Sequence, residues 1–392
     1  MILAIRNRTA VAVLGLFVWA GTALAQGYGY DTPGAAPDND IRQTVARIGY
    51  VGGDVSFSRG DDPDEWQPAD PNVPMTLGDR VWTAGGQLEL QLHGGNIVRL
   101  GQSTDLTALN LTEDTKQLSL SAGVASFSVR RLDDDDVFEV DTPSAAITFE
   151  RTGEYRIDVR PEGDTRVQVR RGRAIVASGG GQVPLGAGDA MTIEGNDPPR
   201  YDMVGMPAPD GWDRWVDERN ARYARVKSYQ YVSPDIAGVP DLDQYGRWQS
   251  IPNYGWCWTP ARVAVGWAPY RAGRWIWQDP WGWTWVSAEP WGWAPYHYGR
   301  WVVWGPHWYW VPVAPRVAVV TYSPALVAFV GGGPGFSVSV GVSTDYIGWF
   351  PLAPRDPLVP WWGRPSTTVV NVTNVTYVNR TYVTVVNQNT FV

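Results

Sequence analysis

The chain has 392 residues and a formal net charge of −8, with 32 Lys and Arg against 40 Asp and Glu. This acidic balance disfavours a general nucleic-acid binder. Its single cysteine, Cys257, excludes an intrachain disulfide and a four-cysteine zinc site. The 43 Gly, 31 Pro and 23 Trp favour short strands and turns over long helices, in a chain long enough for two or more domains.

Residues 1–25 are predicted to be a secretory signal peptide. Arg6 and Arg8 form a basic start, an uncharged apolar stretch follows, and a small-residue pattern ends at Ala25. Cleavage there starts the mature chain at Gln26. The apolar stretch is shorter than the roughly 20 residues that span a bilayer, so we expect no integral membrane segment after cleavage.

A Gly-, Pro- and Asp-rich lead-in at 26–44 precedes an all-β pattern at 45–197. Gln87–Leu92 alternates polar and apolar residues, and the turn Gly94-Gly95-Asn96 leads into the apolar stretch Ile97–Leu100. We therefore expect short strands joined by tight turns in this half of the chain.

Residues 198–245 are predicted to be a linker that contains one helix, at 210–228. Most of the acidic excess lies before Pro198-Pro199, which favours a domain boundary there. Asp210 can cap the helix, and one helical face is expected to dock on a core. That face contains Trp212, Trp215, Val216, Tyr223 and Val226.

A threefold repeat predicts three β-hairpins at 246–312 that together bury their indoles. Each repeat starts with Gly-Arg-Trp and has Trp-x-Trp seven or eight residues later, which places two indoles on one face of a strand. Residues 313–392 are expected to be a β-rich Gly and Pro segment followed by a Val, Thr and Asn tail. That tail either forms an edge hairpin or pairs with another sheet.

Leu77–Val81, Gly86–Leu92, Leu118–Val129, Val140–Ala145 and Gly186–Ala190 together resemble the FecR-type domain of bacterial envelope proteins. FecR proteins proper are inner-membrane regulators that pass a receptor signal to a sigma factor. Because no cytoplasmic segment precedes the hydrophobic stretch, we expect this chain to share only the extracytoplasmic β-module with FecR proteins, and not the regulation of a sigma factor.

The Trp-rich half resembles a proteobacterial family of exported proteins of unknown function, which implies architecture and no activity. The residues that carry this resemblance are Tyr245–Trp248, Trp281–Trp285, Trp293–Trp301 and Trp349–Pro354. The expected fold is therefore all-β: a FecR-like β-sandwich or β-roll, one short helix, and a Trp-rich domain of repeated β-hairpins.

The candidate binding surface is a belt of indoles and arginines in the repeat. Exposed indoles stack on sugar rings, and arginine can hydrogen-bond at the edge. Alternatively, the indoles form the core of the domain, and the arginines are packed between them by cation–π contacts. The belt consists of Arg247, Trp248, Arg274, Trp275, Trp283, Trp285, Arg300, Trp301, Trp308 and Trp310.

For the other candidate sites, a structural role is favoured over a catalytic or metal-binding role. Asp279 and Glu289 share a Pro-Trp-Gly-Trp context, which suits a glycosidase pair or, more simply, one turn made twice. Asp133–Asp136 lacks the spacing of a calcium loop and is expected to be a solvated turn between strands. His297 and His307 have no evident further ligands for a metal.

These patterns favour an exported FecR-like envelope protein that acts as a non-enzymatic binding or scaffolding module, without cofactor or metal. The alternative is a protein that binds cell-wall or surface glycan through exposed indoles. The partner is expected to be an envelope protein or a cell-wall glycan, not a nucleic acid. The expected location is the periplasm or the exterior of a Gram-negative cell.

Overall fold

The computed structural model describes residues 43–179, 181–195, 198–313, 321–331, 346–359, 377–387 and 391. Strands make up about half of these residues and far exceed the helices, which confirms the predicted all-β fold. The predicted signal peptide, its cleavage position between Ala25 and Gln26, and nearly all of the lead-in lie outside the described residues.

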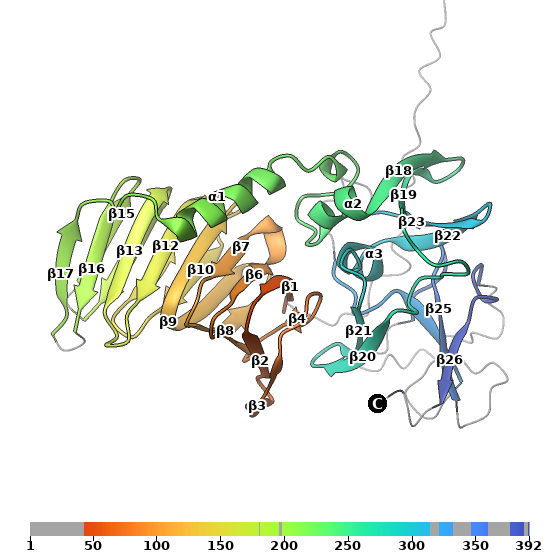
Figure 1. Ribbon diagram of the computed structural model, residues 1–392, viewed down its shortest axis with the longest axis horizontal. Helices are drawn as coiled ribbons and strands as arrows, with labels where there is room; N and C mark the ends of the chain where they lie inside the picture. Colours follow the sequence, from red (N-terminus) through yellow and green to blue (C-terminus); the bar gives the residue numbers. More distant parts are fainter. Residues whose placement is uncertain are drawn as a thin grey trace, which may run out of the picture.

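The N-terminal half is a sandwich of two β-sheets, the first of the two forms expected (Figure 1). In the order of hydrogen-bonded neighbours, one sheet contains β4 (Pro74–Met75), β1 (Ala46–Gly52), β6 (Gln87–Gln91), β7 (Ile97–Leu100), β9 (Thr115–Val129), β12 (Gly153–Val159), β13 (Thr165–Arg171), β16 (Ala190–Glu194) and β17 (Arg200–Val204). The other contains β3 (Asp62–Pro68), β2 (Val55–Arg59), β5 (Arg80–Thr83), β8 (Thr104–Leu111), β9, β10 (Val137–Asp141), β11 (Ala146–Phe149), β14 (Arg173–Ser178) and β15 (Gly181–Gly186).

Strand β9 belongs to both sheets, and Gly123 marks the point where it crosses between them. Residues before Gly123 pair with β8 and β10, and those from Gly123 onward pair with β12 and β7. Gly123 has φ +87°, and a Cβ there would lie 2.3 Å from Oγ1 of Thr104. Only glycine fits this bend without displacing its neighbours.

The inner faces of the two sheets enclose one hydrophobic core. Phe149 of one sheet stacks on Tyr155 of the other, with ring centroids 4.1 Å apart. The alternation predicted for Gln87–Leu92 places Leu88 and Leu90 in this core. It also turns the polar residues of β6 to the outer face of the sheet.

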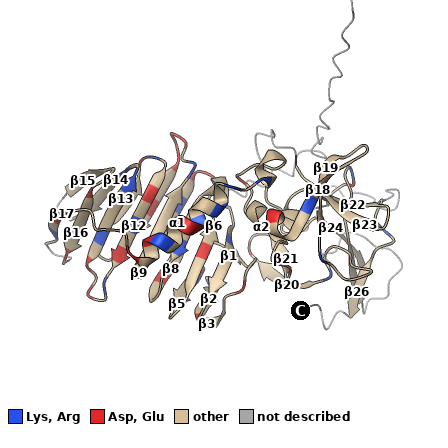
Figure 2. Ribbon diagram, turned by 45° about the horizontal axis from the view of Figure 1, so that its top comes forward, with Lys and Arg blue, Asp and Glu red and all other residues tan. Residues whose placement is uncertain are grey.

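Helix α1 (Gly211–Tyr223) lies across that outer face (Figure 2). Asp210 caps it as predicted, in a reciprocal capping box with Asp213. Val216 and Tyr223 are buried against the sheet, and the indole N–H of Trp212 donates to Oγ of Ser126 at 2.8 Å. The predicted face of the helix is therefore the one that docks, although it docks on the outer face of the sheet and not on the core.

The Trp-rich half contains one hairpin for each repeat. The hairpins are β18 (Gly246–Ile251) with β19 (Gly255–Pro260), β20 (Gly273–Gln278) with β21 (Gly282–Ser287), and β22 (Arg300–Trp304) with β23 (His307–Val311). The first and third join through β19 and β23, where Trp258 lies opposite Trp310, while the second forms a separate two-stranded sheet. A further sheet contains β24 (Val327–Gly331), β25 (Tyr346–Pro351) and, from the tail, β26 (Thr384–Asn387).

The prediction of a single helix at 210–228 needs correction. Helix α1 ends at Tyr223, so Val226 is not part of it. Two short helices, α2 (Val239–Tyr245) and α3 (Trp293–His297), and two 3₁₀ turns, η1 (His93–Gly95) and η2 (Ser228–Gln230), also occur. Five or seven residues make at most about two helical turns, which is too short for an apolar period to show in the sequence.

Candidate functional site

Several indoles of the repeat lie in the core of the Trp-rich domain. Trp285, Trp301, Trp308 and Trp310 are buried, together with Trp258 of the first repeat. Both indoles of the third Trp-x-Trp pair are buried, whereas in each of the other two pairs only the second indole, Trp258 or Trp285, is buried. Of the two interpretations of the belt, the core interpretation therefore describes these four residues.

Two of the buried indoles, Trp301 and Trp310, are also hydrogen-bonded through their N–H groups. Trp301 donates to the carbonyl oxygen of Pro295 at 3.0 Å, and Trp310 donates to that of Tyr298 at 2.6 Å. These acceptors lie within or directly after α3, so the third hairpin and this short helix are fixed to each other. A buried indole N–H is stabilised by such a partner, and for Trp301 and Trp310 the partners are supplied locally.

The other three candidate indoles are half-buried. Trp275 contacts Trp285 and Trp349 edge to face, at centroid distances of 5.2 and 5.5 Å, and Trp283 packs against Phe391. Trp248 contacts Trp310 at 6.1 Å and lies at the edge of the core. The belt therefore does not form one continuous exposed strip.

The three arginines of the repeat occupy different environments. Arg247 is exposed, and Arg300 donates to the carbonyl oxygen of Gly299 at 3.1 Å. Arg274 forms an ion pair with Asp70 of the sandwich at 3.0 Å. Cation–π contacts within the described residues belong to other arginines: Arg59, Arg80, Arg99, Arg130 and Arg219. Arg274 thus contacts the neighbouring domain instead of spacing the indoles.

Asp279 and Glu289 lie beyond opposite ends of β21. A six-residue strand is about 20 Å long, far more than the roughly 5 to 10 Å between the carboxyl groups of a glycosidase pair. Both segments form turns, as the interpretation of one turn made twice expects, but the two turns are not the same. Asp279 lies in the turn between β20 and β21, whereas Glu289 leads into α3.

The Glu289 carboxylate is an anchor inside the aromatic domain. It accepts hydrogen bonds from the indole N–H of Trp267 at 2.6 Å and from the hydroxyl of Tyr296. Burial raises the pKa of Glu289, and these hydrogen bonds partly offset the rise. These hydrogen bonds connect Glu289 to Trp267, earlier in the chain, and to Tyr296 of α3. The environment of Glu289 therefore differs from that of Asp279.

The Trp-rich domain contacts the sandwich through a buried arginine. The side chain of Arg47, on β1, is 1% exposed. Its guanidinium donates to Oδ1 of Asn72, to Oε1 of Gln91 and to the carbonyl oxygen of Pro290, each at 3.0 Å. It also forms a 2.7 Å ion pair with Asp241 of α2. One side chain therefore joins two strands of the sandwich to two segments of the other domain.

Further polar contacts extend this junction. The Asn72 amide donates to the carbonyl oxygens of Ser287 and Glu289, at 3.2 and 2.9 Å. The Gln278 amide of the second hairpin donates to Oγ1 of Thr76 at 2.6 Å. The second hairpin thus packs on the sandwich, while the other two hairpins pair with each other.

Helix α1 is held by a second buried charge cluster, around Glu89 of β6. This carboxylate accepts from Nε of Arg99 and from Nε of Arg219, both at 2.8 Å, and from the hydroxyl of Tyr223 at 2.5 Å. Burial alone would raise the pKa of Glu89. The hydrogen bond from Arg219 and the two positive charges outweigh burial and lower the pKa to about 2.

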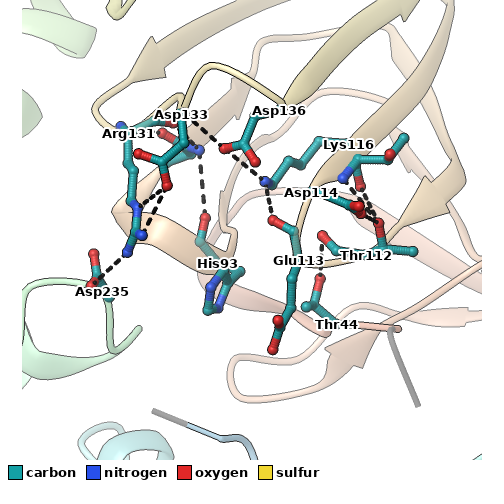
Figure 3. A network of polar contacts seen from close by, with 12 residues as sticks. Thr44, His93, Thr112, Glu113, Asp114, Lys116, Arg131, Asp133, Asp136 and Asp235 are labelled. Carbon is teal, nitrogen blue, oxygen red and sulfur yellow. Dashed lines mark hydrogen bonds and ion pairs between the residues drawn. The ribbon is translucent and has the colours of Figure 1, made fainter. Parts of the chain in front are cut away.

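The acidic run Asp133–Asp136 forms the turn predicted between β9 and β10 (Figure 3). Arg131 pairs with Asp133 at 2.9 Å and with Asp235, in the segment before α2, at 3.2 Å. Asp136 lies 3.5 Å from Nζ of Lys116, whose pKa is lowered by burial. Among the described residues, no cluster of His, Cys, Asp and Glu has a metal-binding arrangement.

The two histidines of the Trp-rich half are far from equivalent. His297 is buried, its Nδ1 lies 2.8 Å from the carbonyl oxygen of Ser323, and burial lowers its pKa to about 3. His307 is exposed at the start of β23. Burial also raises the pKa of the Cys257 thiol to about 12, so that this thiol is unreactive at neutral pH.

One hollow that sequence reasoning missed lies beside the first hairpin. Tyr231 packs against Trp248 and Trp256, with centroids 4.6 and 5.0 Å apart. Lys227 and Asp243 also line this hollow. The Trp-x-Trp motif marked Trp256, but nothing in the sequence indicated that it stays exposed while Trp258 is buried.

Comparison with known proteins supports both resemblances. Residues 79–174 match the FecR protein family, and residues 239–356 match a family of unknown function, DUF6600. None of the curated proteins matches the chain. No helix within the described ranges is both long and apolar enough to cross a bilayer.

Two solved structures of a candidate anti-sigma factor from Parabacteroides distasonis are similar to part of the chain. They are 22% and 20% identical, with TM-scores of 0.29 and 0.30. The matches cover 32% and 34% of this chain, and 59% and 62% of those chains. The chain thus spans less than two thirds of the length of either relative.

Proposed function

Because the chain joins a FecR domain at residues 79–174 to a DUF6600 domain at residues 239–356, we propose that it is an exported, non-enzymatic scaffolding protein of the cell envelope. The observation that carries this proposal is the junction around Arg47. Four polar groups from both domains contact one buried guanidinium. Such a junction holds the two domains in one relative orientation, which a flexible linker would not do.

The arrangement of potential reactive groups supports a role without chemistry. Asp279 and Glu289 are separated by the length of β21, and the Glu289 carboxylate is engaged by Trp267 and Tyr296. Most of the belt indoles are used as core, which favours a scaffold over a broad glycan platform. We infer that the envelope partner is a protein that contacts surfaces of both domains.

Trp277 is a suitable place to test this inference. Its indole is 58% exposed on β20, next to Gln278, which contacts the sandwich. A photoreactive amino acid at position 277 should form discrete protein adducts in living cells. The same substitution at Val265, on an exposed loop of the same domain, should not.

Arg47→Met provides the specific control, because it removes the junction without altering residue 277. Adducts from position 277 should decrease in this background if the partner contacts the fixed pair of domains. Absence of adducts at 277, or adducts that are unchanged by Arg47→Met, would contradict the scaffold. So would release of soluble fragments from purified cell wall by the wild-type protein.

A further inference from the structure

The hollow beside the first hairpin has the composition of a small-ligand site. Its volume is about 310 Å³, and it is lined by Lys227, Gln230, Tyr231, Asp243, Gly246 and Trp248. Sites for small molecules range from about 300 to 1,000 Å³, so this hollow accommodates one ring and not a peptide segment. The 51% exposed indole of Trp256 extends the aromatic wall, since Tyr231 contacts both indoles.

The aromatic wall is held in place from behind. The indole N–H of Trp248 donates to Oγ of Ser228 at 2.8 Å, and the fully buried Ser228 hydroxyl in turn donates to Oδ1 of Asp243. The edge of Trp248 is therefore engaged with the protein, which leaves its ring to pack and to contact a ligand. A site fixed before binding loses less side-chain entropy when a ligand arrives.

The rim supplies hydrogen-bonding groups of both kinds. The Asp243 carboxylate accepts from the backbone N–H groups of Lys227 at 2.6 Å and Ser228 at 3.0 Å, and from the Ser228 hydroxyl. A carboxylate offers about four acceptor positions, so one remains for a ligand hydroxyl. Lys227 adds ammonium donors, and the Gln230 amide can both donate and accept.

We propose that this hollow binds one pyranose ring of an uncharged glycan. The C–H groups on one face of such a ring carry partial positive charge, which complements the negative faces of indole and phenol rings. Its hydroxyls match the donors and acceptors of the rim. Lys227 and Asp243 together contribute no net charge, which gives an anionic ligand no advantage. This inference is independent of the scaffolding role.

Titration calorimetry of the full mature chain tests the proposal. The probes are cellotriose and triacetylchitotriose, which share ring configuration and linkage and differ in the N-acetyl groups. Saturable binding of either probe is expected, and the comparison shows whether the natural source is a plain hexose glycan or an N-acetylated wall glycan. Absence of binding by both would overturn the proposal.

Trp256→Ala should weaken binding by about tenfold, because it removes an exposed stacking face without opening a core cavity. Trp304→Ala is the matched control, since that indole is 44% exposed at the end of β22, in the third hairpin, whereas Trp256 packs against Tyr231 of the hollow. Lys227→Met tests the rim and should weaken binding severalfold. Equal loss in the Trp256 and Trp304 variants, or unchanged binding in Trp256→Ala, would refute the site.

Discussion

The guanidinium of Arg47 lies 2.7 Å from the carboxylate of Asp241 and joins the first strand of the sandwich to helix α2. The arginine is buried, and each of its three side-chain nitrogens has a partner among Asn72, Gln91, Pro290 and Asp241, which offsets the cost of removing its charge from water. This contact makes the two domains one structural unit.

Arg47→Met is therefore expected to destabilise the protein by about 3 to 5 kcal/mol, since it leaves buried polar partners without their donor. Calorimetric melting should change from one transition to two as the domains lose their coupling. Arg171→Met is the control, because Arg171 forms an exposed ion pair with Glu154 that contributes less than about 1 kcal/mol. A single, unshifted transition in Arg47→Met would contradict the role of the junction.

The pKa of Glu89, about 2, predicts an acid-dependent loss of stability. The unfolded carboxyl titrates near 4.5, so the stabilisation is complete above that pH and is lost as pH falls toward 2. This difference corresponds to about 3 kcal/mol. Glu89→Gln should be less stable at pH 7, and the gap between its melting temperature and that of wild type should close below pH 4.5. A gap independent of pH would contradict this assignment.

Neutral, buried His297 should make the Trp-rich domain sensitive to milder acid. Its folded pKa is about 3 against 6.5 for the free group, so protons bind the unfolded chain preferentially between these values. Stability should fall by about 2 kcal/mol between pH 6.5 and 5. In thermal melts, the stability of His297→Asn should decrease less than that of wild type over this pH range. An equally steep decrease would show that His297 is not the group responsible.

Arg274 should contribute little to stability. It pairs with Asp70, and both side chains are 53% exposed, so the pair is screened by solvent. Arg274→Ala is expected to cost less than about 1 kcal/mol in denaturant unfolding, and the double variant with Asp70→Ala should show weak coupling. A much larger loss would indicate the stacked arginine that the repeat suggested.

The mature chain is expected to begin at Gln26. The basic start, the short apolar stretch and the small residue Ala25 together suit signal peptidase cleavage. N-terminal sequencing of protein from the periplasmic or culture fraction measures this directly. Protein that retains Met1 in the membrane fraction would revive a membrane-anchored, FecR-like role.

The sequence by itself determined the local elements of this protein. The alternation of Gln87–Leu92, the Asp210 cap and the Trp-x-Trp pairs each follow from backbone geometry within a few residues. The spacing of Gly-Arg-Trp likewise located three hairpins, because each hairpin needs only its own turn and its own two strands.

Only the tertiary structure decided which side chains of those elements are buried and what they contact. Trp258 is covered because the third hairpin brings Trp310 opposite it, while Trp256, on the same strand face, remains exposed beside Tyr231. Arg274 turns to Asp70, a residue of the other domain. These outcomes depend on contacts between segments far apart in the chain. A local sequence pattern does not specify which distant segment packs against it.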